Sequence, residues 1–347
     1  MQFILTFAPT FRRQAAAELA AAVPDIKFTK HFSEAVALAA TEHSKADFTR
    51  CLLDAEPIFV RHCMPVDGVA ELNGADDTRA AVRGLCAGIC GGAVGAGTRF
   101  SVQCRIISDG DTDLSAKDYE VAVGSWFESA GAVPVFSDTG LLREEIQIVS
   151  IFIYHSRAYA GLSGAAENLN FQADEYRVLS RSGRIISRAE HKLREAIVKF
   201  GLELPPAGGE VWAMDIGAAP GGWSNVLLEY GYHVTAVDPA RLDPRLAEHP
   251  RLEHARCRIE RFEPKHAYAL IVCDMNVGPA QAARMMVTLR PLLAAGGLAV
   301  LTLKLPVSDA ERDIAAAREI LGEAYEVRHI KNLCHNRREV TAVLRAK

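Results

Sequence analysis

Residues 215–223 read DIGAAPGGW and close the apolar segment that begins at Val211. Glycines allow the backbone to approach a ligand closely, because they carry no Cβ. Asp238 ends the next apolar segment, 21 residues after Gly217, and an acid at that position can hydrogen-bond the hydroxyls of a ribose. Together the two features predict a site for a nucleoside-containing cofactor at the first two strands of an open sheet.

The loop departs from the GxGxxG fingerprint that receives a pyrophosphate, because Ala219 replaces its second glycine and Pro220 stiffens the turn. S-adenosylmethionine carries no phosphate, and Asp215 suits its cationic amino-acid end. We therefore expect S-adenosylmethionine as the cofactor. A dinucleotide and a glycine-rich turn without a ligand are the alternatives.

From residue 187 onward, buried apolar segments alternate with helical ones, which predicts an α/β fold with an open, Rossmann-like sheet covered on both faces. Residues 187–190 (SRAE) predict a capping box, in which Ser187 caps a helix and Glu190 reaches back to it. That helix has Leu193 and Ile197 on its apolar face and Lys192 and Glu195 on the opposite one. The expected strands are 211–216, 233–237, 252–257, 270–273, 298–303, 326–330 and 340–344.

Residues 1–166 show a mixed α+β pattern and are expected to form a separate region. The expected strands there are 3–7, 57–63, 99–107 and 146–155, and the expected helices are 10–21, 75–90 and 115–129. Residues 167–186 are polar and aperiodic, which is typical of a linker. The expected organisation is therefore a region 1–166, a linker 167–186 and a domain 187–347.

Four ionisable residues are expected to meet beside the glycine loop. Asp274 and Lys304 follow the fourth and fifth strands of the sheet, so they belong at the edge where open α/β sheets bind ligands. Glu339 starts the last strand and joins that edge if the strand is antiparallel, and Lys192 projects from the preceding helix. Each residue alone could be a strand end, a helix cap or a weak surface pair. Their convergence predicts a catalytic site.

These motifs resemble the FtsJ/RrmJ class of S-adenosylmethionine-dependent ribose 2′-O-methyltransferases over residues 187–345, about half of the chain. Segments 273–275, 303–306 and 337–341 are similar to members that methylate a cytidine of large-subunit ribosomal RNA. Those members carry an N-terminal half with a THUMP RNA-binding module, and the α+β pattern of residues 1–166 is compatible with one.

The resemblance implies a Lys-Asp-Lys-Glu catalytic tetrad in which Lys304 takes the proton of the ribose hydroxyl. The tetrad positions are Lys192, Asp274, Lys304 and Glu339. The implied cofactor contacts are Ser187, Asp215, Gly217, Ala218, Ala219, Pro220, Gly221, Gly222, Trp223, Asp238 and Asp274. The acid that the class places near the adenine is replaced by Arg258, so no residue is assigned to that contact.

The net charge of −4 argues against a nucleic-acid partner on the usual rule that such proteins are basic. Its distribution argues the other way. Residues 177–199 hold seven Lys and Arg against two Glu, and residues 326–347 hold six against two. Both segments flank the expected site, so we expect them to contact phosphates of ribosomal RNA. A solvated charged face is the alternative.

Composition is that of a globular protein, with 49% hydrophobic and 24% charged residues. No segment is expected to cross a membrane, and the N-terminus does not resemble a signal peptide. The eight cysteines form no CxxC pair, and Cys86 and Cys90 lack a second ligand pair. We therefore expect free thiols, no metal and a cytoplasmic location.

Four other functions remain open at this stage. They are a ribose methyltransferase for another RNA, a nonenzymatic RNA-binding or assembly factor, a small-molecule methyltransferase and a dinucleotide-dependent oxidoreductase. An intact tetrad disfavours the second, the unexplained first 165 residues and basic flanks disfavour the third, and the glycine pattern disfavours the last.

Overall fold

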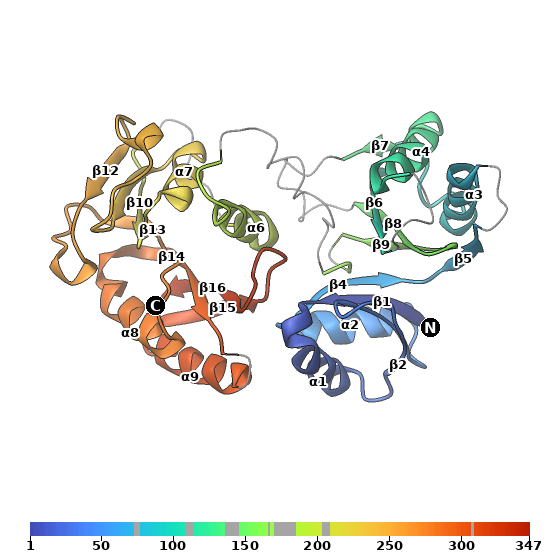
Figure 1. The fold of residues 1–347 in the computed structure, drawn as a ribbon, viewed down its shortest axis with the longest axis horizontal. Coiled ribbons are helices and arrows are strands. Elements are labelled where there is room, and N and C mark those ends of the chain that lie inside the picture. Colours follow the sequence, from blue (N-terminus) through green and yellow to red (C-terminus); the bar gives the residue numbers. More distant parts are fainter. Residues whose placement is uncertain are drawn as a thin grey trace. The chain divides into compact units, whose positions relative to one another are not determined.

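The computed structural model describes residues 1–72, 77–107, 114–135, 146–165, 167–169, 185–202, 209–306 and 309–347. The chain divides into two compact units, Met1–Arg177 and Val178–Lys347 (Figure 1). Most of the expected linker, residues 170–184, lies outside the described residues.

The first sheet of unit 1 has the strand order β2-β3-β1-β4, and its neighbouring strands are antiparallel. Aromatic packing joins this sheet to a helix, since Phe3 stacks on Phe48 with ring centroids 3.8 Å apart. The elements are β1 (Gln2–Phe7), α1 (Arg12–Ala22), β2 (Lys27–His31), β3 (Val36–Ala40), α2 (Lys45–Ala55) and β4 (Val60–Pro65).

The second sheet of unit 1 has the order β5-β9-β8-β6-β7, in which β6 runs parallel to β7 and β8. Two amphipathic helices, α3 and α4, bury their apolar residues against it. The elements are β5 (Gly68–Glu71), α3 (Thr78–Cys90), β6 (Arg99–Ile106), α4 (Ala116–Ser129), β7 (Val133–Pro134), β8 (Gln147–Tyr154) and β9 (Arg157–Gly164).

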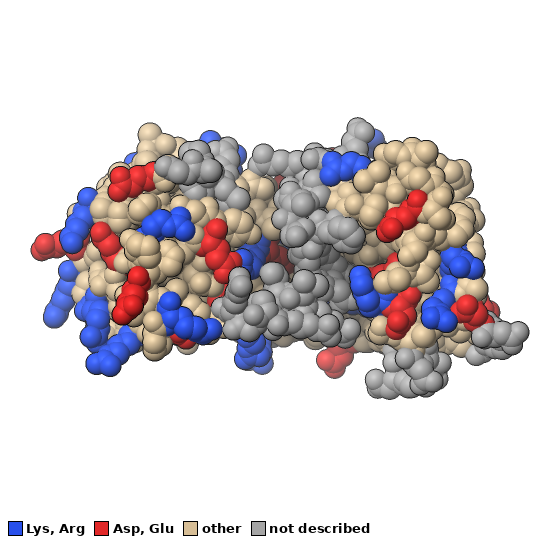
Figure 2. Space-filling view, turned by 90° about the horizontal axis from the view of Figure 1, so that it is seen from above, with Lys and Arg blue, Asp and Glu red and all other residues tan. Residues whose placement is uncertain are grey.

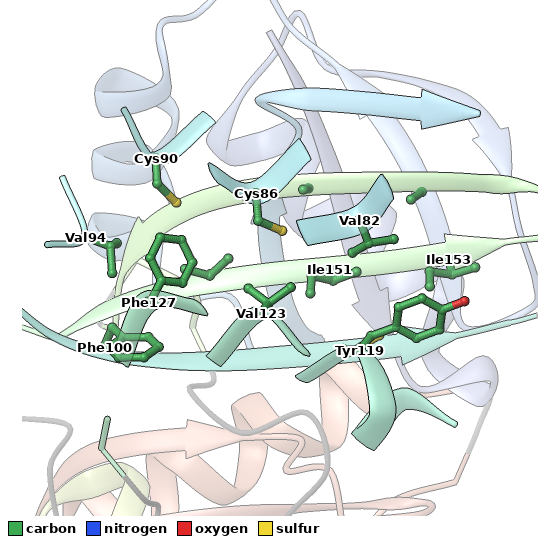
Figure 3. Packing of buried hydrophobic residues seen from close by; sticks show 14 of the residues in the cluster. Val82, Cys86, Cys90, Val94, Phe100, Tyr119, Val123, Phe127, Ile151 and Ile153 are labelled. Atoms are coloured by element: carbon green, nitrogen blue, oxygen red, sulfur yellow. The ribbon is translucent and has the colours of Figure 1, made fainter. Parts of the chain in front are cut away.

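Cys86 and Cys90 belong to this core, which agrees with the expectation of free thiols. Figure 3 shows both side chains on α3 among the apolar residues that α4 and the sheet contribute. Burial raises the pKa of Cys86 to about 12 and that of Cys90 to about 11. Neither thiol is therefore poised to ionise near neutral pH.

Unit 2 contains a sheet that has seven strands in the described residues, with the order β12-β11-β10-β13-β14-β16-β15. Strands β10 to β14 pair in parallel, and β16 is antiparallel to both neighbours. This confirms the expected α/β fold with an antiparallel last strand. The strands are β10 (Trp212–Ile216), β11 (His233–Val237), β12 (Leu252–Ala255), β13 (Tyr268–Cys273), β14 (Leu293–Lys304), β15 (Tyr325–Lys331) and β16 (Glu339–Ala346).

Helices cover both faces of this sheet (Figure 1). On one face, Leu193 and Trp223 pack with Val272 in a single apolar cluster. On the other face lie α8 and α9, which contact each other. The helices are α6 (Glu190–Phe200), α7 (Gly222–Glu229), α8 (Pro279–Leu289) and α9 (Ala310–Gly322).

The start of α6 differs from the expected capping box. The helix begins at Glu190, its N-cap is Ala189, and no side chain caps it. Glu190 reaches past Ser187 and accepts a hydrogen bond from the Ile186 N–H at 2.6 Å. The motif predicted a helix start but gave the wrong cap, because residues 187–189 form a turn in which the Ser187 carbonyl accepts the Glu190 N–H.

Among the residues that the structure describes, no helix is long and apolar enough to span a bilayer.

Candidate active site

The glycine loop joins β10 to α7 and contacts the ends of two other elements. Gly217 has a φ of +70°, and a Cβ there would come within 2.4 Å of Met275 Cγ. A Cβ on Gly222 would come within 2.1 Å of Ser187 Oγ. Close packing thus favours glycine at both positions, and Ser187, one of the expected cofactor contacts, lies against the start of α7.

Four backbone N–H groups of this loop are hydrogen-bonded within the chain. Gly217 and Ala218 donate to the Val237 carbonyl at 3.0 and 3.4 Å, and Gly221 donates to the Ala218 carbonyl at 2.6 Å. Ala219 donates to Asp238, and Pro220 has no N–H to donate. These four N–H groups are not free to bind a pyrophosphate, which argues against the dinucleotide alternative.

Asp238 directly follows β11, as the sequence predicts, and its carboxylate faces the loop. Oδ2 accepts the Ala219 N–H at 3.1 Å, and Oδ1 accepts the Ala240 N–H at 2.7 Å. A carboxylate has about four acceptor sites, so two backbone contacts leave capacity for ribose hydroxyls. The same contacts fix the carboxylate's orientation.

Asp215 lies beneath the loop, with only 2% of its surface exposed. Its Oδ2 accepts the Ser224 hydroxyl at 2.7 Å. Burial raises the pKa of Asp215 to about 7 against the lowering effect of the Ser224 contacts, and the nearby acids Asp274 and Asp238 raise it further. Three acids therefore converge at the loop, an environment that attracts a cationic group and repels a phosphate.

The four expected catalytic side chains meet in a closed ring of alternating charge. Lys192 Nζ lies 2.8 Å from Asp274 Oδ2 and 2.8 Å from Glu339 Oε1. Lys304 Nζ lies 2.6 Å from the other oxygen of each carboxylate. Their side chains are 9–23% exposed. We call these four residues the charge ring.

The sheet register explains why residues so distant in the sequence meet. Lys304 and Glu339 are direct partners in the antiparallel pair β14–β16. Ile216 pairs with Cys273 in the parallel pair β10–β13, so Gly217 and Asp274 leave the sheet side by side. The charge ring and the glycine loop therefore share one edge of the sheet, as expected.

Lys304 carries a proton in this arrangement. Burial by itself lowers the pKa of the Lys304 ammonium, but the Asp274 and Glu339 carboxylates outweigh burial, and the pKa is raised. The sequence left open whether the carboxylates or the neighbouring Lys192 cation determine this pKa. The carboxylates do.

Trp223 belongs to the scaffold rather than to an open surface. Its side chain is 3% exposed, and its indole N–H donates to the Ala189 carbonyl at 2.7 Å, which ties α7 to the start of α6. Two residues that were not among the expected site residues take part in the site. Ser224 holds Asp215, and Met275 packs on Gly217. Each directly follows an expected site residue, Ser224 after Trp223 and Met275 after Asp274, and this adjacency was the available signal in the sequence.

Several cations of the two basic segments are engaged inside unit 2. Arg194 pairs with Glu190 and Glu229, and Lys192 belongs to the charge ring. Lys331 is buried, with 8% exposure. Residues 177, 181 and 184 lie outside the described chain. The exposed arginines beside the site are Arg188, Arg337 and Arg338.

On the face shown in Figure 2, basic and acidic side chains of the described residues are interspersed. Net charge is therefore a poor guide to this surface. The described residues contain no group of three or more His, Cys, Asp or Glu placed to hold a metal ion.

Arg258, which stands where the resemblance places an adenine-contacting acid, is exposed after β12.

Comparison with known proteins identifies the C-terminal domain. Residues 185–309 match the family model described as FtsJ-like methyltransferase. The segment covers the glycine loop, Asp274 and Lys304, and ends before Glu339. Unit 2 thus contains an FtsJ-like methyltransferase domain on a Rossmann-like sheet, in agreement with the resemblance found in the sequence.

Curated relatives carry the name Ribosomal RNA large subunit methyltransferase M. The protein of Halorhodospira halophila is 37% identical over 161 residues, which are 46% of this chain and 47% of the relative. That of Laribacter hongkongensis is 40% identical over 141 residues, 38% and 39% of the two chains. That of Shewanella frigidimarina is 34% identical over 210 residues, 56% of each. The matched part of the chain spans about half the length of these relatives or less.

Proposed function

We propose that this protein transfers a methyl group from S-adenosylmethionine to the 2′-hydroxyl of a ribose in large-subunit ribosomal RNA, with a cytidine as the acceptor nucleotide. The observation that carries the proposal is the charge ring beside the glycine loop. The FtsJ-like match and the names of the relatives support the reaction class and the RNA.

The residues around the loop fit S-adenosylmethionine. Asp238 is oriented to receive ribose hydroxyls, and the acids Asp215 and Asp274 suit the cationic methionine end. The engaged amides of the loop disfavour a phosphate-bearing cofactor. When bound, the cofactor supplies an electrophilic methyl group on a sulfonium.

The charge ring positions the acceptor hydroxyl and takes its proton. Lys304 is the proposed base, and Asp274 and Glu339 hold its Nζ in place. Because the pKa of Lys304 is raised, only a small fraction is neutral at pH 7, and that fraction grows as pH increases. Lys192 contacts the same two carboxylates, so they are shared between the two ammonium groups. Alignment of the hydroxyl with the methyl group supplies a further part of the rate.

We further propose that unit 1 binds the RNA as a THUMP-like module, while Arg188, Arg337 and Arg338 contact phosphates near the acceptor. Its α+β architecture and its separate compact fold support this assignment. The exposure of the three arginines supports their part.

The test is transfer of labelled methyl groups to ribosomal RNA, with ribose methylation mapped by nucleotide. Lys304→Ala should lower the transfer rate by about 10²–10⁴-fold and leave the Kd of S-adenosylmethionine nearly unchanged. Lys265→Ala, an exposed lysine that precedes β13, is the matched control and should behave as wild type. Equal transfer by both variants would remove Lys304 as the base. Tight cofactor binding without transfer to any RNA would favour a small-molecule acceptor.

A further inference from the structure

Glu195 lies on the polar side of α6, one turn after Lys192, where the sequence pattern suggests a solvated face. Its side chain is instead only 12% exposed. The carboxylate accepts three hydrogen bonds from the connection between β15 and β16. They come from the Cys334 N–H at 2.8 Å, the His335 N–H at 3.0 Å and the His335 Nδ1 at 2.7 Å.

The connection that Glu195 holds leads directly into Glu339. Within it, the Leu333 N–H donates to Asn336 Oδ1 at 2.8 Å. Asn332 Nδ2 donates to the Glu339 backbone carbonyl at 2.7 Å. These bonds make a compact turn whose far end fixes the start of β16. A constraint on residues 334–335 is therefore transmitted to Glu339.

Glu195 consequently joins the two elements that supply opposite sides of the charge ring. Lys192 is on the same helix three residues earlier, and Glu339 follows the turn that Glu195 binds. The rings of His191 and His335 stack alongside, with centroids 4.9 Å apart. The 2.8 Å contact between Lys192 Nζ and Glu339 Oε1 therefore depends on the position of α6 relative to the β15–β16 turn.

We propose that Glu195 is a positioning residue for the reaction, which sets the separation of Lys192 and Glu339 by clamping α6 to the β15–β16 turn. The inference rests on the proposed function only for its kinetic consequence, since the geometric consequence holds for any reaction at this site. Glu195 does not touch the reacting groups itself.

Glu195→Gln is the sharpest variant because it keeps the size of the side chain. A carboxylate accepts from both backbone amides, whereas a carboxamide presents an NH₂ group to one of them, and two donors then face each other. Glu253→Gln is the matched control. Glu253 is on β12, outside the site, and its carboxylate accepts a hydrogen bond from His266 Nε2 at 3.2 Å.

In steady-state methyl transfer, Glu195→Gln should lower kcat by about 10–100-fold, since small displacements at a reacting centre have effects of that size. The Kd of S-adenosylmethionine should change by less than about twofold, because Glu195 does not contact the loop or Asp238. Glu253→Gln should leave both quantities unchanged. An unchanged kcat in Glu195→Gln overturns the proposal.

A double-mutant cycle separates positioning from general destabilisation. In a Lys192→Met background, Glu195→Gln should cause a smaller further loss of kcat than in the wild type, because one side chain it positions is gone. Equal fold losses in both backgrounds would show that Glu195 acts elsewhere. If Glu195→Gln fails to fold, His335→Ala replaces it. That variant keeps both backbone contacts and should give a smaller loss of kcat with the same unchanged Kd.

Crystal structures of both Gln variants give a readout that does not depend on catalysis. The Lys192 Nζ to Glu339 Oε1 distance should exceed hydrogen-bonding range in Glu195→Gln and stay near 2.8 Å in Glu253→Gln. An unchanged distance in Glu195→Gln overturns the inference. If the wild type methylates no RNA, the proposed function fails, but this measurement still decides whether Glu195 positions the ring.

Discussion

Each unit buries a cluster of polar side chains, and the two clusters differ in charge. In unit 1, Gln103 Nε2 donates to Ser150 Oγ at 2.7 Å and to Asn168 Oδ1 at 3.0 Å. In unit 2, the charge ring holds two ammonium groups and two carboxylates. The first cluster consists of amides and a hydroxyl, with His62 Nε2 2.8 Å from Gln103 Nε2, whereas all four members of the ring are ionisable. The difference assigns structural support to the first cluster and chemistry to the second.

Asp215 gives the largest expected effect, because it is a buried acid whose pKa is raised by burial and by the neighbouring acids Asp274 and Asp238. Its pKa of about 7 exceeds that of an unfolded aspartate, about 3.9, so the folded state holds a proton that the unfolded chain has released. Stability from this group is therefore complete below about pH 4 and is lost as the pH rises to 7. The loss amounts to roughly 4 kcal/mol as an upper bound.

Asp215→Asn should remove this loss, so the variant should gain stability over the wild type between pH 4 and pH 7, with no further gain above. Urea unfolding in a Trp126→Phe background reports on unit 2 through Trp212 and Trp223. The variant should also bind S-adenosylmethionine more weakly. A stability difference independent of pH would contradict the assignment.

Glu339→Gln tests whether the charge ring controls the Lys304 proton. Methyl transfer should fall by about 10²-fold, since Lys304 loses a positioning contact. The limb of the pH–rate profile along which the rate rises with pH should move to lower pH, because one of the two carboxylates that raise the pKa of Lys304 is gone. Lys192→Met should move the limb to higher pH, since it removes a competing cation. Shifts of the same sign in both variants would refute the scheme.

Gln103→Leu tests the Gln103 cluster of unit 1. The change removes the amide that contacts Ser150, Asn168 and His62 and should cost about 1–3 kcal/mol of stability in unit 1. Hydrogen exchange of peptides from unit 1 measures the loss. The pH–rate profile at saturating RNA should match that of the wild type. A displaced pH–rate profile would mean that the Gln103 cluster influences the chemistry.

Sequence patterns predicted unit 2 better than unit 1 for a physical reason. Buried parallel strands are apolar throughout and alternate with helices, so all seven were found, and Asp274 and Lys304 followed from the strand ends. In unit 1, β2 reads KFTKH and is mostly exposed, and β5 has four residues. Such short edge strands lack the alternation that marks a half-buried strand. The interior strands β3 and β9 and the helix α2 were also missed; β3 reads VALAA and β9 reads RAYAGLSG, and both are rich in alanine or glycine, which are depleted in strands.

Hydrogen bonds between side chains and backbone groups far away in the sequence were the second feature that the sequence could not predict. Glu195 was placed on the polar face of its helix, because the pattern cannot show that backbone amides about 140 residues away bind it. The capping box had the right residue types, but Glu190 serves Ile186, Arg194 and Asn225 instead of Ser187. Side-chain chemistry can be read from residue types, whereas the backbone group that a side chain meets depends on the tertiary fold.

Substitution of Arg337 or Arg338 is expected to have the smallest effect. It extends the comparison from the two buried clusters to the surface of unit 2. Both arginines are exposed beside Glu339, and the Arg338 carbonyl accepts the Leu305 N–H at 2.8 Å, so the backbone that carries them is fixed to the residue after Lys304. Each substitution by Ala should weaken RNA binding by about 2–10-fold and reduce the slope of log affinity against log salt by about 1. The single-turnover rate at saturating RNA should not change, because neither side chain belongs to the charge ring.

Arg312→Ala is the control for these two variants, since Arg312 is 73% exposed on α9 and pairs with Asp309 and Asp313. It should leave both the affinity and the salt slope unaltered. If all three variants weaken binding equally, the RNA responds to overall charge and not to the arginines beside the site. If none does, unit 1 carries the affinity alone. Either result would sharpen the proposed division between RNA binding by unit 1 and methyl transfer at the charged edge of unit 2.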